Sequence, residues 1–245
     1  MTRARILGFM LPAVLALVAF AVIPGLRGQP QNPSAKSQRK AVDESRFPIA
    51  DFSAAEPTDP IQRARRRSRQ QKYDKSDWAV NPDTVSDSTV RVDSVDQNLP
   101  AFPLAQSTVV VTGKITDSRA YLSDDKTGVY SVFSLQVDDV INNASGKTLA
   151  PGALLELERE GGRVKFPSGR VHLYITNEQD MPLVGSHYVL FLANGNNDLV
   201  FQIVTGYELR EGKVYPLDDL PKSKIYQNAD ETTFLSELRM KIPNP

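Results

Sequence analysis

Apolar and polar residues alternate along most of the chain after residue 105, and this period of two predicts β-strands. Val109, Val111 and Ile115 share one face of the first predicted strand, in which Gly113 marks a bend or bulge. Similar runs centre on residues 133–137, 155–157, 164–166, 171–175 and 199–203. The run 188–192 is apolar on both faces, so we expect it to be the most buried strand.

Turn-forming residues separate these runs. The polar stretch 123–128 divides the first two strands, and Gly161-Gly162, residues 167–169 and Glu211-Gly212 indicate further hairpins. The alternation slips at Asp138-Asp139, as it does at a β-bulge.

The end of the chain has helical periodicity. Asn228 is a predicted N-cap with Glu231 three residues on, and Phe234, Leu238 and Ile242 form a single apolar stripe. Many short strands and one terminal helix predict a mostly β fold, a small OB-like Greek-key β-barrel over residues 105–226. We expect the helix, within 227–245, to pack on the barrel and close one of its openings.

The first residues predict export. Arg3 and Arg5 precede an uninterrupted apolar run from Ile6 to Ile23, which is long enough either to span a membrane or to form a signal peptide. A clean small-x-small cleavage site is missing, which favours an uncleaved anchor within residues 1–28. The positive-inside rule puts the N-terminus in the cytoplasm and the body outside the cytoplasmic membrane. If the leader is cleaved, the protein is secreted or periplasmic.

Composition narrows the chemistry further. The chain has no Cys, which excludes a lipoprotein anchor, disulfides, thiol nucleophiles and thiolate metal sites. Residues 1–80 hold 14 Lys and Arg against 7 Asp and Glu, whereas residues 81–245 hold 15 against 22. A basic N-terminal part therefore precedes an acidic domain, and the acidic domain argues against a nucleic-acid partner.

Residues 29–104 have few large apolar side chains, so we interpret them as a disordered tether. Within it, Asp59 and Pro60 indicate the start of a helix over residues 60–75. This helix would carry the densest basic cluster of the chain, which is Arg63, Arg65, Arg66, Arg67, Arg69 and Lys72. The cluster is either a solvated charge run or a site for anionic lipid or a cell-wall polymer.

A second basic patch lies in the acidic domain. Its expected ligand is an anion held by charge-assisted hydrogen bonds, and its residues are Arg163, Lys165, Arg170, His172 and Tyr174. Alternatively, Glu156, Glu158 and Glu160 lie across the Gly161-Gly162 hairpin and pair with the basic residues.

No motif in the sequence assembles a catalytic or metal site. His172 and His187 are the two histidines, and neither belongs to a nucleophile-elbow or zinc-binding pattern. Asp117, Asp124 and Asp125 are oxygen ligands in principle, but turn chemistry explains them better than calcium binding. We therefore expect a protein that is not an enzyme and has no cofactor or metal.

The strand order resembles that of a known fold. The segments VVVTGKITD, YSVFSLQVDDVI, LLELE, LVGSHYVLFLANG and LVFQIVTGY resemble the OB-type barrel of netrin-like domains and tissue inhibitors of metalloproteinases, over residues 105–216. Those domains are rich in disulfides and inhibit through an N-terminal Cys that chelates a metal. Their inhibitory activity and functional residues do not carry over to this cysteine-free chain. The tether and terminal helix also resemble exported bacterial proteins of uncharacterised function.

Together these patterns predict an extracytoplasmic, membrane-tethered β-barrel that binds or scaffolds a partner, such as another envelope protein. Two alternatives remain open. One is an envelope-associated hydrolase that uses His172 or a carboxylate, and the other is a structural envelope protein held by its Arg-rich segment.

The leader yields a direct test. The intact protein purified from its native envelope should have the full mass of 27.1 kDa if the anchor is uncleaved. A mass lower by the first 20 to 30 residues, as a signal peptidase leaves it, contradicts the anchor.

Overall fold

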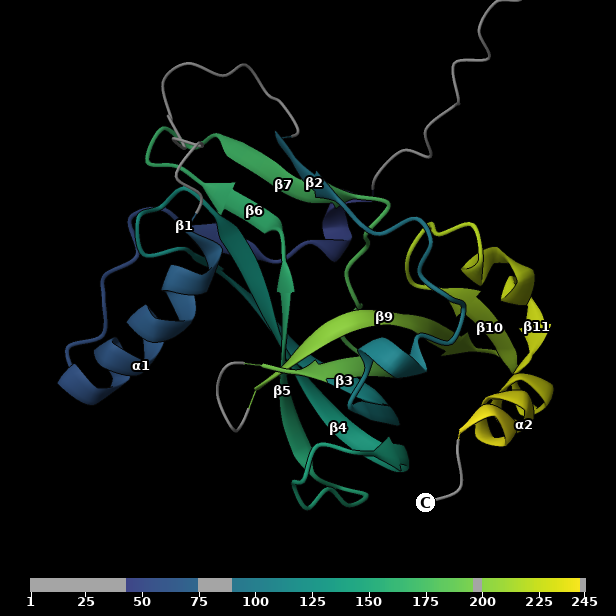
Figure 1. Ribbon diagram of the computed structural model, residues 1–245. Coiled ribbons are helices and arrows are strands. Elements are labelled where there is room, and N and C mark those ends of the chain that lie inside the picture. Colours follow the sequence, from purple (N-terminus) through teal and green to yellow (C-terminus); the bar gives the residue numbers. More distant parts are fainter. Residues whose placement is uncertain (1–42, 75–89, 196–199, 243–245) are drawn as a thin grey trace, which may run out of the picture. The chain divides into compact units, whose positions relative to one another are not determined.

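The computed structural model of the chain describes residues 43–74, 90–195 and 200–242, with only the backbone for 90–94 (Figure 1). These residues are mostly β and include a C-terminal helix, as predicted, and their strands form two sheets where the sequence predicted a single barrel. No helix among them is long and apolar enough to cross a membrane. The predicted leader, residues 1–28, lies outside the described ranges.

The elements have the following bounds. The strands are β1 Ile49–Asp51, β2 Val90–Ser94, β3 Val109–Leu122, β4 Val129–Asn143, β5 Leu154–Glu160, β6 Gly162–Lys165, β7 Val171–Asn177, β8 His187–Asn194, β9 Val200–Arg210, β10 Lys213–Pro216 and β11 Ala229–Asp230. The α-helices are α1 Pro60–Gln70 and α2 Glu231–Lys241. Short 3-10 helices are η1 Glu44–Arg46, η2 Gln71–Tyr73, η3 Leu104–Gln106 and η4 Ser223–Tyr226.

Five strands of the larger sheet close into a ring. The sheet runs β11-β10-β9-β5-β4-β3-β8, and β8 also pairs with β9. Within the ring β5 and β9 are parallel, and the other neighbours are antiparallel. The main apolar core lies between these strands and includes Val109, Val111, Ile115, Phe133, Leu135, Leu157, Tyr188, Leu190, Leu192, Phe201 and Ile203.

β8 is the most buried strand, as its sequence predicted. Residues 188–192 are all 0% exposed. Tyr188, Leu190 and Leu192 belong to the core of the ring, whereas Val189 and Phe191 belong to a second apolar cluster on the opposite face. A strand that is buried on both faces has no polar side to show, which explains its continuous apolar run.

The predicted bulge is present, and it lies opposite the step from Thr112 to the predicted Gly113. Thr112 lies opposite Asp139 and Gly113 opposite Val137, so Asp138 is the extra residue of β4. Gly113 is required here because a Cβ at this position would lie 2.4 Å from the carbonyl oxygen of Gln136.

The hairpin predicted at Gly161-Gly162 is wrong. β6 pairs with β7 and β1 in a separate four-stranded sheet of order β1-β6-β7-β2, and not with β5. Gly161 and Gly162 have φ values of 104° and 151°, which let the chain leave the larger sheet and enter the smaller one. The hairpins predicted at residues 167–169 and 211–212 do form, between β6 and β7 and between β9 and β10.

Much of the predicted disordered tether is folded. Residues 43–74 and 95–104 belong to the same unit as the domain, which begins at Asp43 and not near residue 105. Widely spaced apolar residues of this polar sequence fill separate places in the fold: Phe47, Tyr73, Leu99 and Phe102 are buried. Composition averaged over the segment hides such single anchors. The rest of the predicted tether, 29–42 and 75–89, lies outside the described residues.

The C-terminal helix α2 packs on the outer face of the ring. Phe234 and Leu238 are buried against the second apolar cluster, which includes Phe102, Phe191 and Tyr207. The helix therefore covers strand faces and does not close an opening. Its N-cap is Asp230, which accepts a hydrogen bond from the Thr233 amide, and not Asn228 as predicted.

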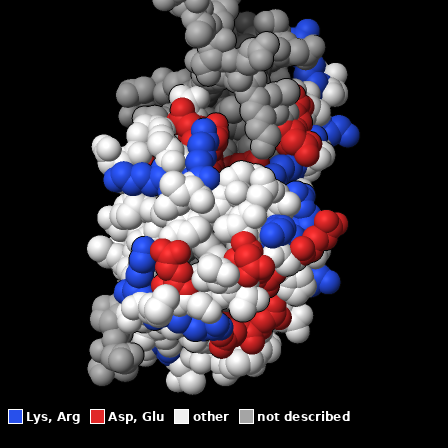
Figure 2. All heavy atoms as spheres, turned by 90° about the vertical axis from the view of Figure 1, so that its right-hand side faces the viewer, with Lys and Arg blue, Asp and Glu red and all other residues white. Residues whose placement is uncertain are grey.

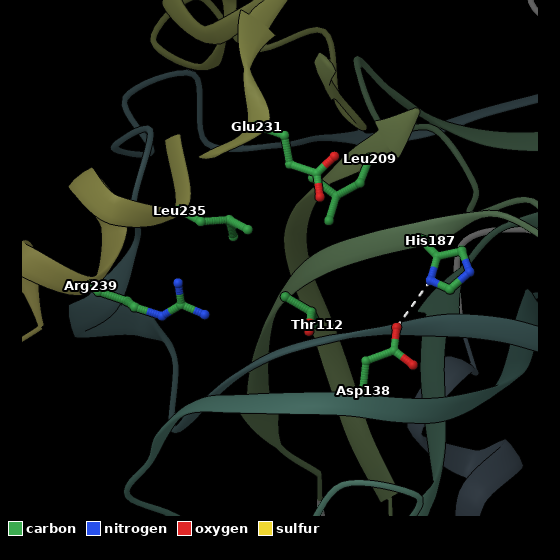
Figure 3. Close-up of a pocket in the computed structure, with 7 residues that line it drawn as sticks. All are labelled: Thr112, Asp138, His187, Leu209, Glu231, Leu235 and Arg239. Carbon is green, nitrogen blue, oxygen red and sulfur yellow. Dashed lines mark hydrogen bonds and ion pairs between the residues drawn. The ribbon is translucent and has the colours of Figure 1, made fainter. Parts of the chain in front are cut away.

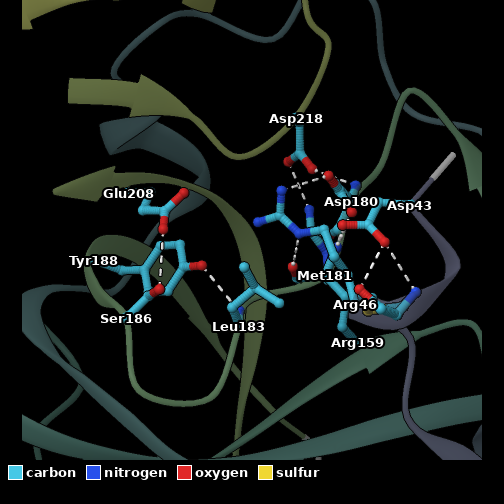
Figure 4. Close-up of polar contacts among 11 residues, drawn as sticks. Asp43, Arg46, Arg159, Asp180, Met181, Leu183, Ser186, Tyr188, Glu208 and Asp218 are labelled. Carbon is cyan, nitrogen blue, oxygen red and sulfur yellow. Dashed lines mark hydrogen bonds and ion pairs between the residues drawn. The ribbon is translucent and has the colours of Figure 1, made fainter. Parts of the chain in front are cut away.

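A buried polar network connects the short helix η1 to the strands of the ring (Figure 4). The Arg159 guanidinium lies 2.6 Å from Asp218, and both side chains are almost completely buried. Arg159 also donates to the Asp180 carbonyl, and Asp180 pairs with Arg46 at 3.0 Å. Asp218 accepts further hydrogen bonds from Thr205 and from the Asp180 amide. Burial raises the pKa of Asp180, although Arg46 opposes the shift.

Two neighbouring aspartates test this network. Asp218→Ala leaves the Arg159 charge buried without its carboxylate partner and should lower the free energy of unfolding by about 3–5 kcal/mol. Asp219→Ala removes only an exposed pair with Lys224 and should cost less than about 1 kcal/mol. Urea unfolding of the two variants measures the difference, and equal losses contradict the role of the network.

Candidate functional site

The predicted anion patch is not one site. Its members were Arg163, Lys165, Arg170, His172 and Tyr174. His172 and Tyr174 are buried beside Val164 and Phe166, and burial raises the pKa of Tyr174 to about 12. Arg163 turns to the other side of β6 and donates to the Phe47 carbonyl at 2.7 Å. Strand alternation thus separates the residues, and a hydrolase site with an accessible His172 finds no support.

The glutamates of β5 do not pair with that patch either. β5 and β6 lie in different sheets, so Glu156 and Glu158 do not face a hairpin partner. They meet the Arg-rich stretch of the predicted tether, residues 60–73, which comprises α1 and η2 and which we call the docked segment. The two halves of opposite net charge therefore contact each other within one chain.

Arg69 is the centre of this contact. Its two terminal nitrogens lie 2.7 and 3.1 Å from the Glu156 carboxylate, and its Nε lies 2.7 Å from Glu158. The Glu158 side chain is only 4% exposed and also has Lys72 at 3.6 Å. A buried carboxylate is energetically unfavourable without a charged partner. Arg69 and Lys72 of the docked segment therefore stabilise the buried Glu158 carboxylate.

Tyr73 adds an aromatic contact. Its ring stacks on Tyr130 with centroids 4.4 Å apart, and its hydroxyl donates to Glu158 at 3.0 Å. Burial, followed by the Glu158 charge, raises the pKa of Tyr73 far above its ordinary value. Tyr121 also stacks on Tyr130, with centroids 5.6 Å apart, and has Arg66 over its own ring.

The connection between β3 and β4 completes the surface under the docked segment. Asp124 pairs with Arg67, and the Leu122 carbonyl accepts a hydrogen bond from Gln70. Gly128 lies so close that a Cβ there would be 2.1 Å from the Tyr73 carbonyl oxygen. We call this surface the acidic–aromatic face, and its residues are Tyr121, Asp124, Tyr130, Glu156 and Glu158.

The predicted use of the basic cluster on an anionic surface needs correction. Arg66, Arg69 and Lys72 are half-buried and turned toward the acidic–aromatic face. Arg63, Arg65 and Arg67 remain exposed, and two of them have carboxylate partners in Glu56 and Asp124. Each basic residue near an anionic surface contributes about 1 kcal/mol to binding that surface. Because three of the six basic residues face the domain instead, about half of this attraction is lost.

A separate pocket of about 290 Å³ lies between α2 and the ring (Figure 3). The bulge in β4 places Asp138 beside His187, with 3.0 Å between Oδ2 and Nδ1. Arg239 of α2 reaches Asp139, the next residue of the bulge. The remaining lining residues are Thr112, Leu209, Glu231 and Leu235.

This pocket lacks the contacts of a catalytic site. A carboxylate orients His187 as it orients a general base, but no hydrogen bond joins the imidazole to a hydroxyl of another described residue. The described residues also hold no cluster of His, Asp and Glu suited to a metal ion. The space-filling view of the side that carries α2 and β11 shows basic and acidic side chains interspersed there (Figure 2).

Sequence reasoning missed the residues that the structure brings together. Tyr121 alternates with buried positions on β3 and was a readable signal, whereas Tyr130 lies in a continuous run of buried residues on β4. The pairing of Arg69 with Glu156 joins residues 87 positions apart, and no local pattern reports such a contact.

Comparison with known proteins adds no family. No known protein family matches the chain, and no curated protein is significantly similar to it in sequence.

The tyrosine contact predicts an alkaline transition. An undocked Tyr73 ionises near pH 10, whereas the docked one stays protonated, so the undocked state binds fewer protons above that pH. Docking should therefore weaken as the pH rises from about 10 to 12, and near-ultraviolet circular dichroism of the Tyr73–Tyr130 stack reports the loss. Tyr73→Phe should abolish this part of the signal change and Tyr215→Phe should not. Identical titrations of wild type and Tyr73→Phe contradict the contact.

Proposed function

We propose that this protein is an extracytoplasmic, membrane-tethered module of the OB-barrel type, which binds or scaffolds a partner and does not transform a substrate. The observation that carries the proposal is the closed ring of five strands with a recognition surface on its β4–β5 side.

The order of strands supports the barrel type. Around the ring the strands follow the order β3-β4-β5-β9-β8, and β5 and β9, the third and fifth of them in the sequence, are parallel. This order agrees with the Greek-key arrangement of an OB barrel. The five segments that resemble netrin-like domains are these same five strands. The strands β6 and β7 of the smaller sheet lie in the sequence between β5 and β8.

The position of the acidic–aromatic face supports a binding role. OB-type barrels bind ligands on the face of their second and third strands and on the loop between the first and second. Here those elements are β4, β5 and the 123–128 connection, which carry four of the five residues of the acidic–aromatic face. Leu154 extends the same side of β5 and is 71% exposed.

The membrane part of the proposal comes from the leader. Arg3 and Arg5 ahead of the Ile6 to Ile23 run support an N-terminus in the cytoplasm and a domain outside. The Arg-rich segment supports a purely structural role less well, because half of its basic residues already face the domain.

Photo-crosslinking in the native membrane tests the binding role. A benzophenone amino acid in place of Leu154 should capture a discrete partner of the full-length protein. The same amino acid in place of Ile225 on η4, which is 73% exposed, is the matched control and should capture none. Adducts from neither position, or the same adducts from both, contradict a binding site on the β4–β5 face.

A further inference from the structure

We propose that the acidic–aromatic face is an exchangeable binding site for arginine-bearing helical protein segments, and that the docked segment is its resident intramolecular ligand. The inference rests on the proposed binding function and names the class of partner for that same face.

The helix of the docked segment is held as a ligand is held, and Tyr73, after the helix, is the residue of the segment that joins an apolar cluster, with Tyr130 and Val132. α1 and α2 have 11 residues each, but α1 buries only Gln70, whereas α2 buries Phe234 and Leu238. The apolar side chain of Ile61 on α1 is 65% exposed. Side-chain contacts to carboxylates, rings and one carbonyl keep the segment in place, and such contacts can be replaced by those of another segment.

The contacts define what the face recognises. Arg66 lies over Tyr121, Arg69 forks onto Glu156 and reaches Glu158, and Tyr73 stacks on Tyr130. These three side chains are spaced i, i+3 and i+7, which is one face of a helix. The partner class is therefore a helical segment with two arginines and an aromatic residue at this spacing, bound with its polar face inward.

The resident segment fits incompletely. The Nε of Arg66 is buried without a hydrogen-bond partner among the described residues. Beside it lies a cavity of about 210 Å³, whose lining includes Arg66, Gln70, Tyr121 and Phe52. A segment that buries no unpaired donor at this position, or that fills this space, has an advantage that the resident lacks.

The chain can release the segment without opening the rest of the fold. β1 precedes it and pairs with β6, and β2 follows it and pairs with β7. Both flanks are thus held by the smaller sheet, and the ring does not depend on α1 for strand pairing. Because the resident is tethered, it competes at an effective concentration of the order of millimolar, so an outside segment binds the closed protein weakly.

Arg69 offers a way to release the resident and leave the face unchanged. Arg69→Glu replaces the contacts with Glu156 and Glu158 by a repulsive carboxylate, and no residue of the acidic–aromatic face is altered. Arg65→Glu is the matched control with the same change of charge, since Arg65 is an exposed residue of the same helix, away from these contacts.

The experiment titrates the full-length protein with a fluorescein-labelled peptide of residues 57–75 and follows anisotropy. Arg69→Glu should bind the peptide at least about tenfold more tightly than wild type, because the tethered competitor is released. Arg65→Glu should bind like wild type, and a peptide that itself carries Arg69→Glu should not bind the Arg69→Glu protein.

Hydrogen exchange gives an independent test if Arg69→Glu folds poorly. In wild type, amides of 60–73 should exchange through an opening that leaves β8 protected, and excess peptide should increase that exchange. Exchange of 60–73 only together with β8 overturns the inference, as does equal peptide binding by wild type and a folded Arg69→Glu. If photo-crosslinking at Leu154 captures a partner but the peptide does not bind, the proposed binding function is supported and only the arginine-bearing helical partner class is excluded.

Discussion

Closure of the ring is the constraint on which the rest of this structure depends. β9 has to pair with β5 on one side and β8 on the other, and only then do the inward side chains of all five strands face one another. Without disulfides the domain has no other covalent or metal restraint in its described part. Ring closure also decides what lies outside. It turns alternate residues of β8 and β9 toward α2, and it exposes the outer side of β4 and β5 to the docked segment.

The sequence predicts the parts of the fold that follow from local periodicity. The run from Tyr188 to Leu192 predicts a doubly buried strand, and Gly113 with Asp138 predicts the bulge, because each pattern is complete within a few residues. The pattern at Gly161-Gly162 is equally local but ambiguous. Two glycines with positive φ occur both in hairpin turns and where a chain passes from one sheet to another. Only the close packing of Gly161 against Met181 and the Tyr174 carbonyl distinguishes the second case from the first.

The candidate site was beyond such reasoning because it is made of complementarity over long distances. The basic cluster and the β5 glutamates were both visible, but each was given the wrong partner. Burial of Glu158 explains the actual choice: a carboxylate that strand alternation places on the outer face becomes buried only when Arg69, Lys72 and Tyr73 cover it.

The order of strands in the ring has a consequence for biosynthesis. The chain emerges from the ribosome with β3, β4 and β5 first, and these strands can pair as a meander. The open edges of that meander lie on β3 and β5, and their ring partners, β8 and β9, end only at residues 194 and 210. Until about 50 further residues have followed β5, the nascent domain exposes two unpaired strand edges that attract other chains. Closure of the ring is thus a late event in the synthesis of this domain.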